Sequence, residues 1–154
     1  MRFTLEGNSE WTGNFEREWH GGVDDVLRFP GSEPLVLVIA GGLAYLIDVQ
    51  ARRLVRTFSP VEAVAADQER DVIYVSDGIR VEAVGENGIL WTTERISWDG
   101  IRNLRMQEGR LEGDACDPTS DGNWTPFSID PATGEVRGGS YSGPPMTFDD
   151  GISG

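Results

Sequence analysis

Lysine is absent from this sequence of 154 residues, and cysteine and histidine each occur only once. Without lysine, the chain can form no Schiff base and has no phosphate-binding loop of the Walker type. The single cysteine, Cys116, excludes an internal disulfide and a cysteine-rich zinc site, and its acidic neighbours disfavour a reactive thiolate. The single histidine, His20, lies outside any nucleophile motif, so we expect a packing or surface role. The sequence thus indicates no catalytic residue and no cofactor.

Positive charge is also scarce. Thirteen arginines face 26 aspartates and glutamates, which gives a net charge of −13. Nucleic-acid binding and binding to an anionic membrane surface both need clustered cations, so this balance argues against either partner.

Long apolar runs are missing. The longest, residues 35–40, is too short to cross a bilayer, and the first residues contain no apolar stretch typical of a signal peptide. We therefore expect a soluble cytoplasmic protein, of bacterial type.

Turn-forming and aromatic residues are plentiful. Twenty glycines and eight prolines indicate many turns, while five tryptophans, six phenylalanines and three tyrosines can fill a core. A chain of this length buries about 68–70% of its unfolded surface. We expect one β-rich domain over residues 1–154, with a flexible tail at 141–154.

Short strands separated by glycine turns follow one another along the chain. Residues 35–40 and 43–48 flank Gly41-Gly42, and residues 54–58 return the chain. A second copy of this order has predicted strands at 71–76, 79–84 and 89–93, separated by turns at Asp77-Gly78 and 86–88. Asp-Gly and Asn-Gly pairs favour tight hairpins of type I′.

A third, more polar copy has predicted strands at 110–115, 124–130 and 134–137, with an expanded loop at 117–123. Because proline donates no ladder hydrogen bond, Pro126 predicts that 124–130 is an edge strand or contains a bulge. Trp11, Phe15 and Trp19 have helical spacing, but neighbouring glycines favour strand or loop there.

Each copy is preceded by a short segment with one apolar pattern. These segments, 23–26, 61–64 and 101–104, define repeats over about 23–59, 61–98 and 101–140. Repeats of this length with four strands resemble those of β-propellers of the WD40 or quinoprotein type. The resemblance covers residues 23–140, implies architecture only, and includes Trp98-Asp99-Gly100 just before the third repeat.

The resemblance implies an all-β, antiparallel protein of about three to three and a half propeller-like blades, the half blade coming from residues 2–6 and 14–19. A closed ring needs at least four blades. The same meanders could instead form a β-sandwich or an irregular barrel, or two chains could join. We expect a homodimer whose interface uses the neutral segment 23–59 or the N-terminal strands, because acidic surfaces repel one another.

The densest group of carboxylates lies in the third repeat. Oxygen ligands on a loop can hold Ca²⁺, and Asp114, Asp117 and Asp121 are weak candidates. Their spacing is not that of an EF-hand, and Asp-Pro and Asp-Gly pairs also make ordinary turns. We expect no tightly bound metal.

Acidity is concentrated in the second repeat, where residues 61–98 contain eight acids and three arginines. Acidic loops with aromatic neighbours can steer and bind a cationic partner. We expect a non-catalytic module that binds a basic protein, for example an immunity or inhibitor protein. The alternative is a small carboxylate- or metal-dependent enzyme, or a small-ligand-binding domain. The predicted partner surface comprises Glu82, Glu86, Trp91, Glu94, Trp98 and Asp99.

Overall fold

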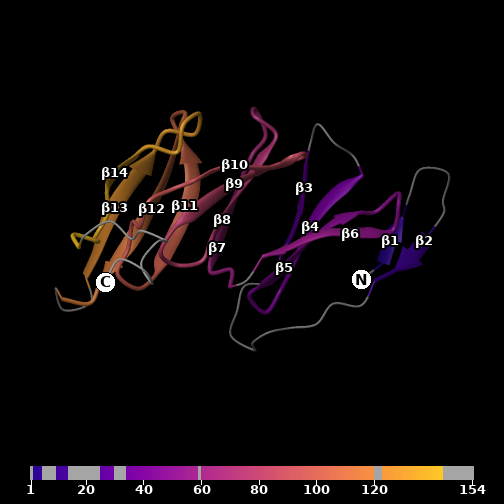
Figure 1. Ribbon diagram of the computed structural model, residues 1–154, viewed down its shortest axis with the longest axis horizontal. Helices are drawn as coiled ribbons and strands as arrows, with labels where there is room; N and C mark the ends of the chain where they lie inside the picture. The colour runs from indigo at the N-terminus through magenta and orange to yellow at the C-terminus, as the bar shows by residue number, and fades with distance from the viewer. Residues whose placement is uncertain are drawn as a thin grey trace, which may run out of the picture.

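A computed structural model describes residues 2–4, 10–13, 25–29, 34–58, 60–119 and 123–143, and these residues form strands, turns and loops. Three four-stranded antiparallel sheets and one two-stranded hairpin make up the fold. Figure 1 shows them following one another along the long axis in chain order, from β1 and β2 to β11–β14. The described part contains no helix long and apolar enough to cross a membrane. The predicted all-β class is confirmed.

The first sheet is a meander of β3 (Asp25–Arg28), β4 (Leu35–Ala40), β5 (Leu43–Asp48) and β6 (Arg53–Phe58). The turn between β4 and β5 is Gly41-Gly42, and both glycines have positive φ angles, 56° and 83°, which residues with a side chain rarely adopt. This tight turn fixes the pairing of β4 with β5.

The second sheet repeats the same order with β7 (Ala63–Asp67), β8 (Val72–Ser76), β9 (Val81–Gly85) and β10 (Gly88–Thr92). Its turn between β8 and β9 is longer than predicted, because residues 77–80 all lie outside the strands. Of these four residues, Gly78 has the positive φ, 96°. The connection is therefore not a type I′ turn, which needs two positive φ angles.

The third sheet contains β11 (Ile101–Gln107), β12 (Arg110–Asp117), β13 (Asn123–Ile129) and β14 (Val136–Gly138). The three sheets begin at residues 25, 63 and 101, so 38 residues separate each start from the next. The predicted set of three antiparallel four-stranded meanders is confirmed.

Pro126 lies in β13, which is an interior strand rather than an edge strand, and its pairing with β12 contains no bulge. The prediction that 124–130 is an edge strand or contains a bulge was therefore wrong. The pairing with β14 covers only residues 127–129 of β13, and Gly139 N donates to Pro126 O at 3.0 Å. Since N and O of one strand residue point to the same side, the missing donor of Pro126 points past the end of the β14 strand.

The second sheet packs between the other two. Along β8, Ile73 and Val75 belong to a core shared with the first sheet, while Val72 and Tyr74 belong to a core shared with the third. All five residues of β8 are buried. A continuous apolar strand is expected where both faces of a sheet are covered.

The hairpin of β1 (Arg2–Thr4) and β2 (Glu10–Thr12) covers the outer face of the first sheet. Phe3 is buried in a cluster with Val36, Val38, Ile47 and Val49. The first of the two N-terminal strands predicted at 2–6 and 14–19 is thus present at 2–4, and it pairs with a strand at 10–12 that was not predicted. Residues 14–19, His20 and the end of the tail, 144–154, lie outside the described residues.

Candidate functional site

One end of the sheets gathers the segments that connect them. Glu62 N donates to Ser76 O at 2.8 Å, Gly100 N donates to Gly78 O at 2.9 Å, and Cys116 N donates to Gly100 O at 2.9 Å. These bonds bring residues 60–62, the turn 77–80 and the connection 93–100 together. We call this the connector end. The turns 68–71, 86–87 and 108–109 lie at the opposite end, as the strand pairing requires.

Three carboxylates converge at the connector end. Burial raises the pKa of Glu62; the backbone N–H of Ile101 opposes this shift, and the negative charges of Asp99 and Asp77 add to it. The Glu62 carboxyl occupies the space that a Cβ on Gly78 would fill. Glu62, Asp77 and Asp99, which we call the acidic triad, therefore repel one another in a partly shielded position.

The turn that carries Asp77 is held by its own side chains. Asp77 Oδ1 accepts hydrogen bonds from Ile79 N at 2.9 Å and from Arg80 N at 2.8 Å. Ser76 Oγ donates to Arg80 O at 2.8 Å and accepts from Gly78 N at 3.0 Å. Short polar side chains that bond nearby backbone groups stabilise such turns, so the position of the Asp77 carboxylate is fixed.

Aromatic rings lie beside the acidic triad. Trp98 meets Tyr141 edge to face, with ring centroids 4.6 Å apart, and the Arg95 guanidinium lies 5.4 Å and 4.5 Å from the two centroids. Arg95 Nη2 also donates to Trp98 O at 2.8 Å. Two of the predicted acids, Glu94 and Asp99, are exposed on the same connection.

The other three predicted surface residues lie elsewhere. Trp91 stacks on Tyr74 with centroids 5.7 Å apart and donates from Nε1 to Pro131 O at 2.9 Å, between the second and third sheets. Glu86 is exposed in the turn after β9, at the opposite end. Glu82 faces the first sheet and lines a pocket. The structure thus brings together Glu94, Trp98 and Asp99, but not the whole predicted surface.

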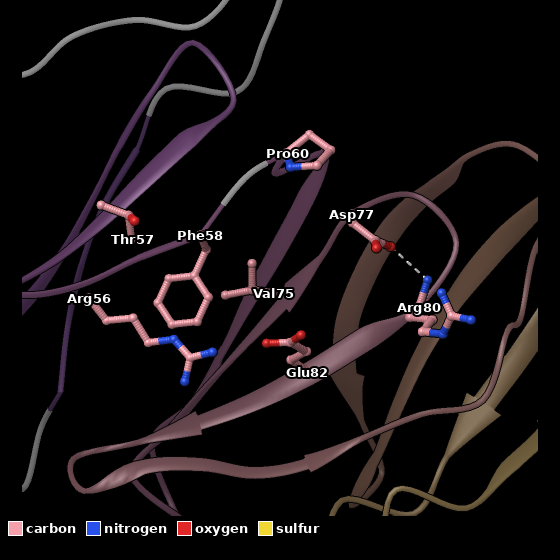
Figure 2. Close-up of a pocket in the computed structure, with 8 residues that line it drawn as sticks. All are labelled: Arg56, Thr57, Phe58, Pro60, Val75, Asp77, Arg80 and Glu82. Carbon is pink, nitrogen blue, oxygen red and sulfur yellow. Dashed lines mark hydrogen bonds between the residues drawn. The ribbon is translucent and has the colours of Figure 1, made fainter. Parts of the chain in front are cut away.

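The pocket lies in the seam between the first and second sheets (Figure 2). It has a volume of 190 Å³ and opens to solvent near the connector end. We call it the seam pocket. It is lined by Arg56, Thr57, Phe58, Pro60, Val75, Asp77, Arg80 and Glu82.

The seam pocket combines charges of both signs with an apolar wall. In Figure 2, the charged ends of Arg56 and Glu82 point toward each other from opposite sides, and Phe58 and Val75 lie alongside them. The Arg56 guanidinium lies 5.1 Å from the centroid of the Phe58 ring. Thr57 has the only hydroxyl among the lining residues, and no base is hydrogen-bonded to it in the described part of the chain. These groups are suited to binding rather than to nucleophilic catalysis.

The weak metal candidates are held by separate partners. Asp114 accepts a hydrogen bond from Asn103 Nδ2 at 2.8 Å and lies 3.6 Å from Arg102 Nε. Asp117 Oδ1 accepts from Thr119 N at 3.0 Å and from its hydroxyl at 2.6 Å. Three positions apart on one strand, the two carboxylates point to opposite faces. Asp121 lies outside the described residues, and among those described no group of three metal-ligating side chains occurs.

Glu62, Asp77 and Arg56 were not selected from the sequence as site residues. Glu62 and Asp77 were visible only as members of an acidic segment, and Asp77 as half of a turn pair. Nothing in the sequence marks Arg56, because its position opposite Glu82 depends on how two sheets stack. Searches against models of known families and against curated proteins found no match for this chain.

Proposed function

We propose that the chain is a non-catalytic binding module, built as an open arc of propeller-like blades, that binds a basic protein at its connector end. The arc is supported by the contact between β7 and β11, the first strands of the second and third sheets. In a propeller, the first strands of neighbouring blades lie closest to the central axis.

The observation that carries this proposal is the convergence of three carboxylates at the connector end, where the Glu62 carboxyl lies against Gly78, next to the fixed carboxylate of Asp77, and close enough to Asp99 to interact with its charge. Mutual repulsion of unpaired carboxylates is relieved when a guanidinium or ammonium group enters between them. The rings of Trp98 and Tyr141 add the amphipathic contact area that protein interfaces favour. An inhibitor or immunity-type protein for a cationic toxin is one concrete form of this function.

A titration by calorimetry with a synthetic peptide of ten arginines tests the proposal. Glu62→Gln, Glu94→Gln and Asp99→Asn together should weaken binding about tenfold, since each exposed charge pair contributes about 0.2–1 kcal/mol. The matched control is Glu86→Gln, Glu108→Gln and Glu135→Gln. It removes the same charge from three exposed residues, of which Glu86 and Glu108 lie in turns at the opposite end.

The control should bind within about twofold of the unmodified chain, because charges that no cation contacts are largely screened by salt. Equal weakening by the two triple variants would mean that the peptide responds to net charge alone. That result would refute a site at the connector end.

A further inference from the structure

We propose that the seam pocket binds a small zwitterion of the α-amino-acid class, with its carboxylate on Arg56 and its ammonium group on Glu82. This goes beyond the proposed function, because it requires no protein partner and does not use Glu62 or Asp99.

The two charges lie on facing surfaces of neighbouring sheets. Arg56 pairs with Leu46, whose side chain lies in the core between the first and second sheets, so Arg56 faces the second sheet. Glu82 pairs with Val75, which belongs to the same core, so Glu82 faces the first sheet. Within the described residues, neither side chain forms an ion pair, so their charged atoms are more than 4.0 Å apart across the pocket.

A ligand with both charges can contact both side chains, whereas a ligand with a single charge can pair with only one of them. A guanidinium prefers a carboxylate that accepts two parallel hydrogen bonds, and the half-buried Glu82 prefers a compact cation. A molecule with only one charge would leave the other side chain, the exposed Arg56 or the half-buried Glu82, without a ligand contact. Asp77 and Arg80 also line the pocket, but the Asp77 carboxylate is engaged by two backbone N–H groups of its own turn. The facing pair of Arg56 and Glu82 thus favours ligands that carry a carboxylate and an ammonium group.

Size and wall chemistry limit the ligand further. The volume of 190 Å³ equals the share of about six water molecules in the liquid, well below the 300–1,000 Å³ of sites for drug-sized ligands. Phe58 and Val75, which are 8% and 5% exposed, form the apolar wall between the charges. A short aliphatic side chain such as that of valine would cover this wall.

The pocket is formed before any ligand arrives. Its walls are β6, β8 and β9, and its rim is the turn in which Asp77 accepts hydrogen bonds from two backbone N–H groups. Arg56 lies over the Phe58 ring, which restricts its rotamers. Preformed walls reduce the entropy that a ligand must offset on binding.

Titration of the full chain by amide NMR with L-valine tests the proposal. Saturable shifts should be confined to residues near 56–58 and 75–82. N-acetyl-L-valine lacks the cation and L-valinamide lacks the carboxylate, so each should bind about tenfold more weakly, as expected for loss of one charged hydrogen bond.

Two variants test which side chain binds the ammonium group of the ligand and which binds its carboxylate. Glu82→Gln should remove the preference for valine over N-acetylvaline, and Arg56→Gln should remove the preference for valine over valinamide. Arg53→Gln on the same strand and Glu69→Gln in the turn before β8 are matched controls outside the pocket, and both should retain the preferences.

The absence of saturable shifts with valine, equal affinity for the three ligands, or equal losses in the control variants would each overturn the proposal. The ligand series uses the unmodified chain, so it stays decisive even if a variant fails to fold. The arginine-peptide titration depends on other residues, and its failure would leave this result unaffected.

Discussion

The first and third sheets lie on the two sides of the second sheet, and the faces they turn away from it are opposite in character. The outer face of the first sheet is apolar, and Val36, Val38 and Ile47 lie buried under Phe3. The outer face of the third sheet is charged. Its pairs include Arg102 with Asp114 and Arg105 with Glu112, each at 3.6 Å, and the Arg102 guanidinium lies 4.0 Å from the centroid of the Trp124 ring.

The strands of the two sheets differ in their pattern of buried residues. Five of six residues of β4 are buried, whereas buried and half-buried residues alternate along β12. A strand that is apolar at every position needs a layer on each side, and an alternating strand can face water. The first sheet therefore depends on the N-terminal hairpin, while no further layer among the described residues covers the outer face of the third sheet.

The two outer faces should differ most in how much stability is lost when a carboxylate is introduced on each of them. Val36 is 1% exposed, so Val36→Asp buries an unpaired charge and should lower the free energy of unfolding by about 4 kcal/mol or more. Ser128→Asp is the matched change on the third sheet. It should be neutral or stabilising by up to about 1 kcal/mol, because Ser128 already accepts a hydrogen bond from Arg110 Nε.

In addition, Arg110 Nη2 is buried with no hydrogen-bond partner in the described part of the chain, and the new carboxylate could accept from it. Urea denaturation of both variants measures the two effects. Equal losses of stability would show that the two faces do not differ in the way described.

Removal of the cover should have the next largest effect. Phe3 is 6% exposed, and Phe3→Ala should cost about 2–4 kcal/mol, somewhat less than a central core position because the hairpin has only two strands. It should also increase binding of a dye such as ANS to the uncovered apolar face. Urea denaturation and dye fluorescence check both, and unchanged stability would mean that the first sheet needs no cover.

A smaller effect is expected inside the second sheet, which is covered on both faces. The Tyr74 hydroxyl donates to Asp67 Oδ2 at 2.8 Å, and the Asp67 side chain is 4% exposed. Tyr74→Phe should cost about 1–2 kcal/mol at pH 7, because it removes a donor from a buried carboxylate.

The pH dependence of this loss has a definite sign. Burial pushes the pKa of Asp67 upward, but hydrogen bonds from Tyr74 and Arg70 hold it below its ordinary value of 3.8. Stabilisation by ionised Asp67 is thus present above pH 3.8 and is lost as the pH falls through the folded-state value. The difference between unmodified chain and variant should shrink in acid, and a constant difference would contradict this account.

The smallest change in stability concerns the edge of the first sheet. Leu54 and Val55 on β6 are 53% and 44% exposed. If the first repeat forms the predicted homodimer, light scattering should give twice the chain mass of 16.9 kDa. Leu54→Lys with Val55→Lys should give the monomer while changing subunit stability by less than about 0.5 kcal/mol.

Leu90 on β10 is 60% exposed, and Leu90→Lys is the control that should leave the dimer intact. A mass of 16.9 kDa for the unmodified chain would contradict the prediction. A dimer that only the control disrupts would place the interface on the second sheet instead.

Local sequence was sufficient to predict the strands of the three four-stranded sheets to within a few residues, but not the hairpin strand β2. The runs at 35–40 and 43–48 carry their own turn, Gly41-Gly42, and the structure has strands at these positions. Pro126 was misjudged, because a missing donor excludes pairing only on one side and at one residue. The strand could therefore keep a partner on both sides.

The candidate sites could be predicted only in part. Glu94, Trp98 and Asp99 lie on one connection, so closeness in sequence placed them together. Trp91 is only seven residues from Trp98, yet its ring packs between two sheets, because it lies on β10 and faces the third sheet, whereas Trp98 lies on the connection after that strand. The seam pocket joins residues 26 positions apart in sequence, Arg56 and Glu82, on different sheets, and their meeting depends on the order of stacking.

Strand order has a consequence for how the chain assembles. Among the described strands, every pairing joins neighbours in sequence. Both connections between the four-stranded sheets are bonded to a turn of the sheet before them, Val61 N to Gly42 O at 2.7 Å and Gly100 N to Gly78 O at 2.9 Å. Loop closure therefore spans few residues, which favours fast folding for an all-β protein. The first sheet can form while the third is still being synthesised, and each finished sheet then offers an apolar face as the template for the next.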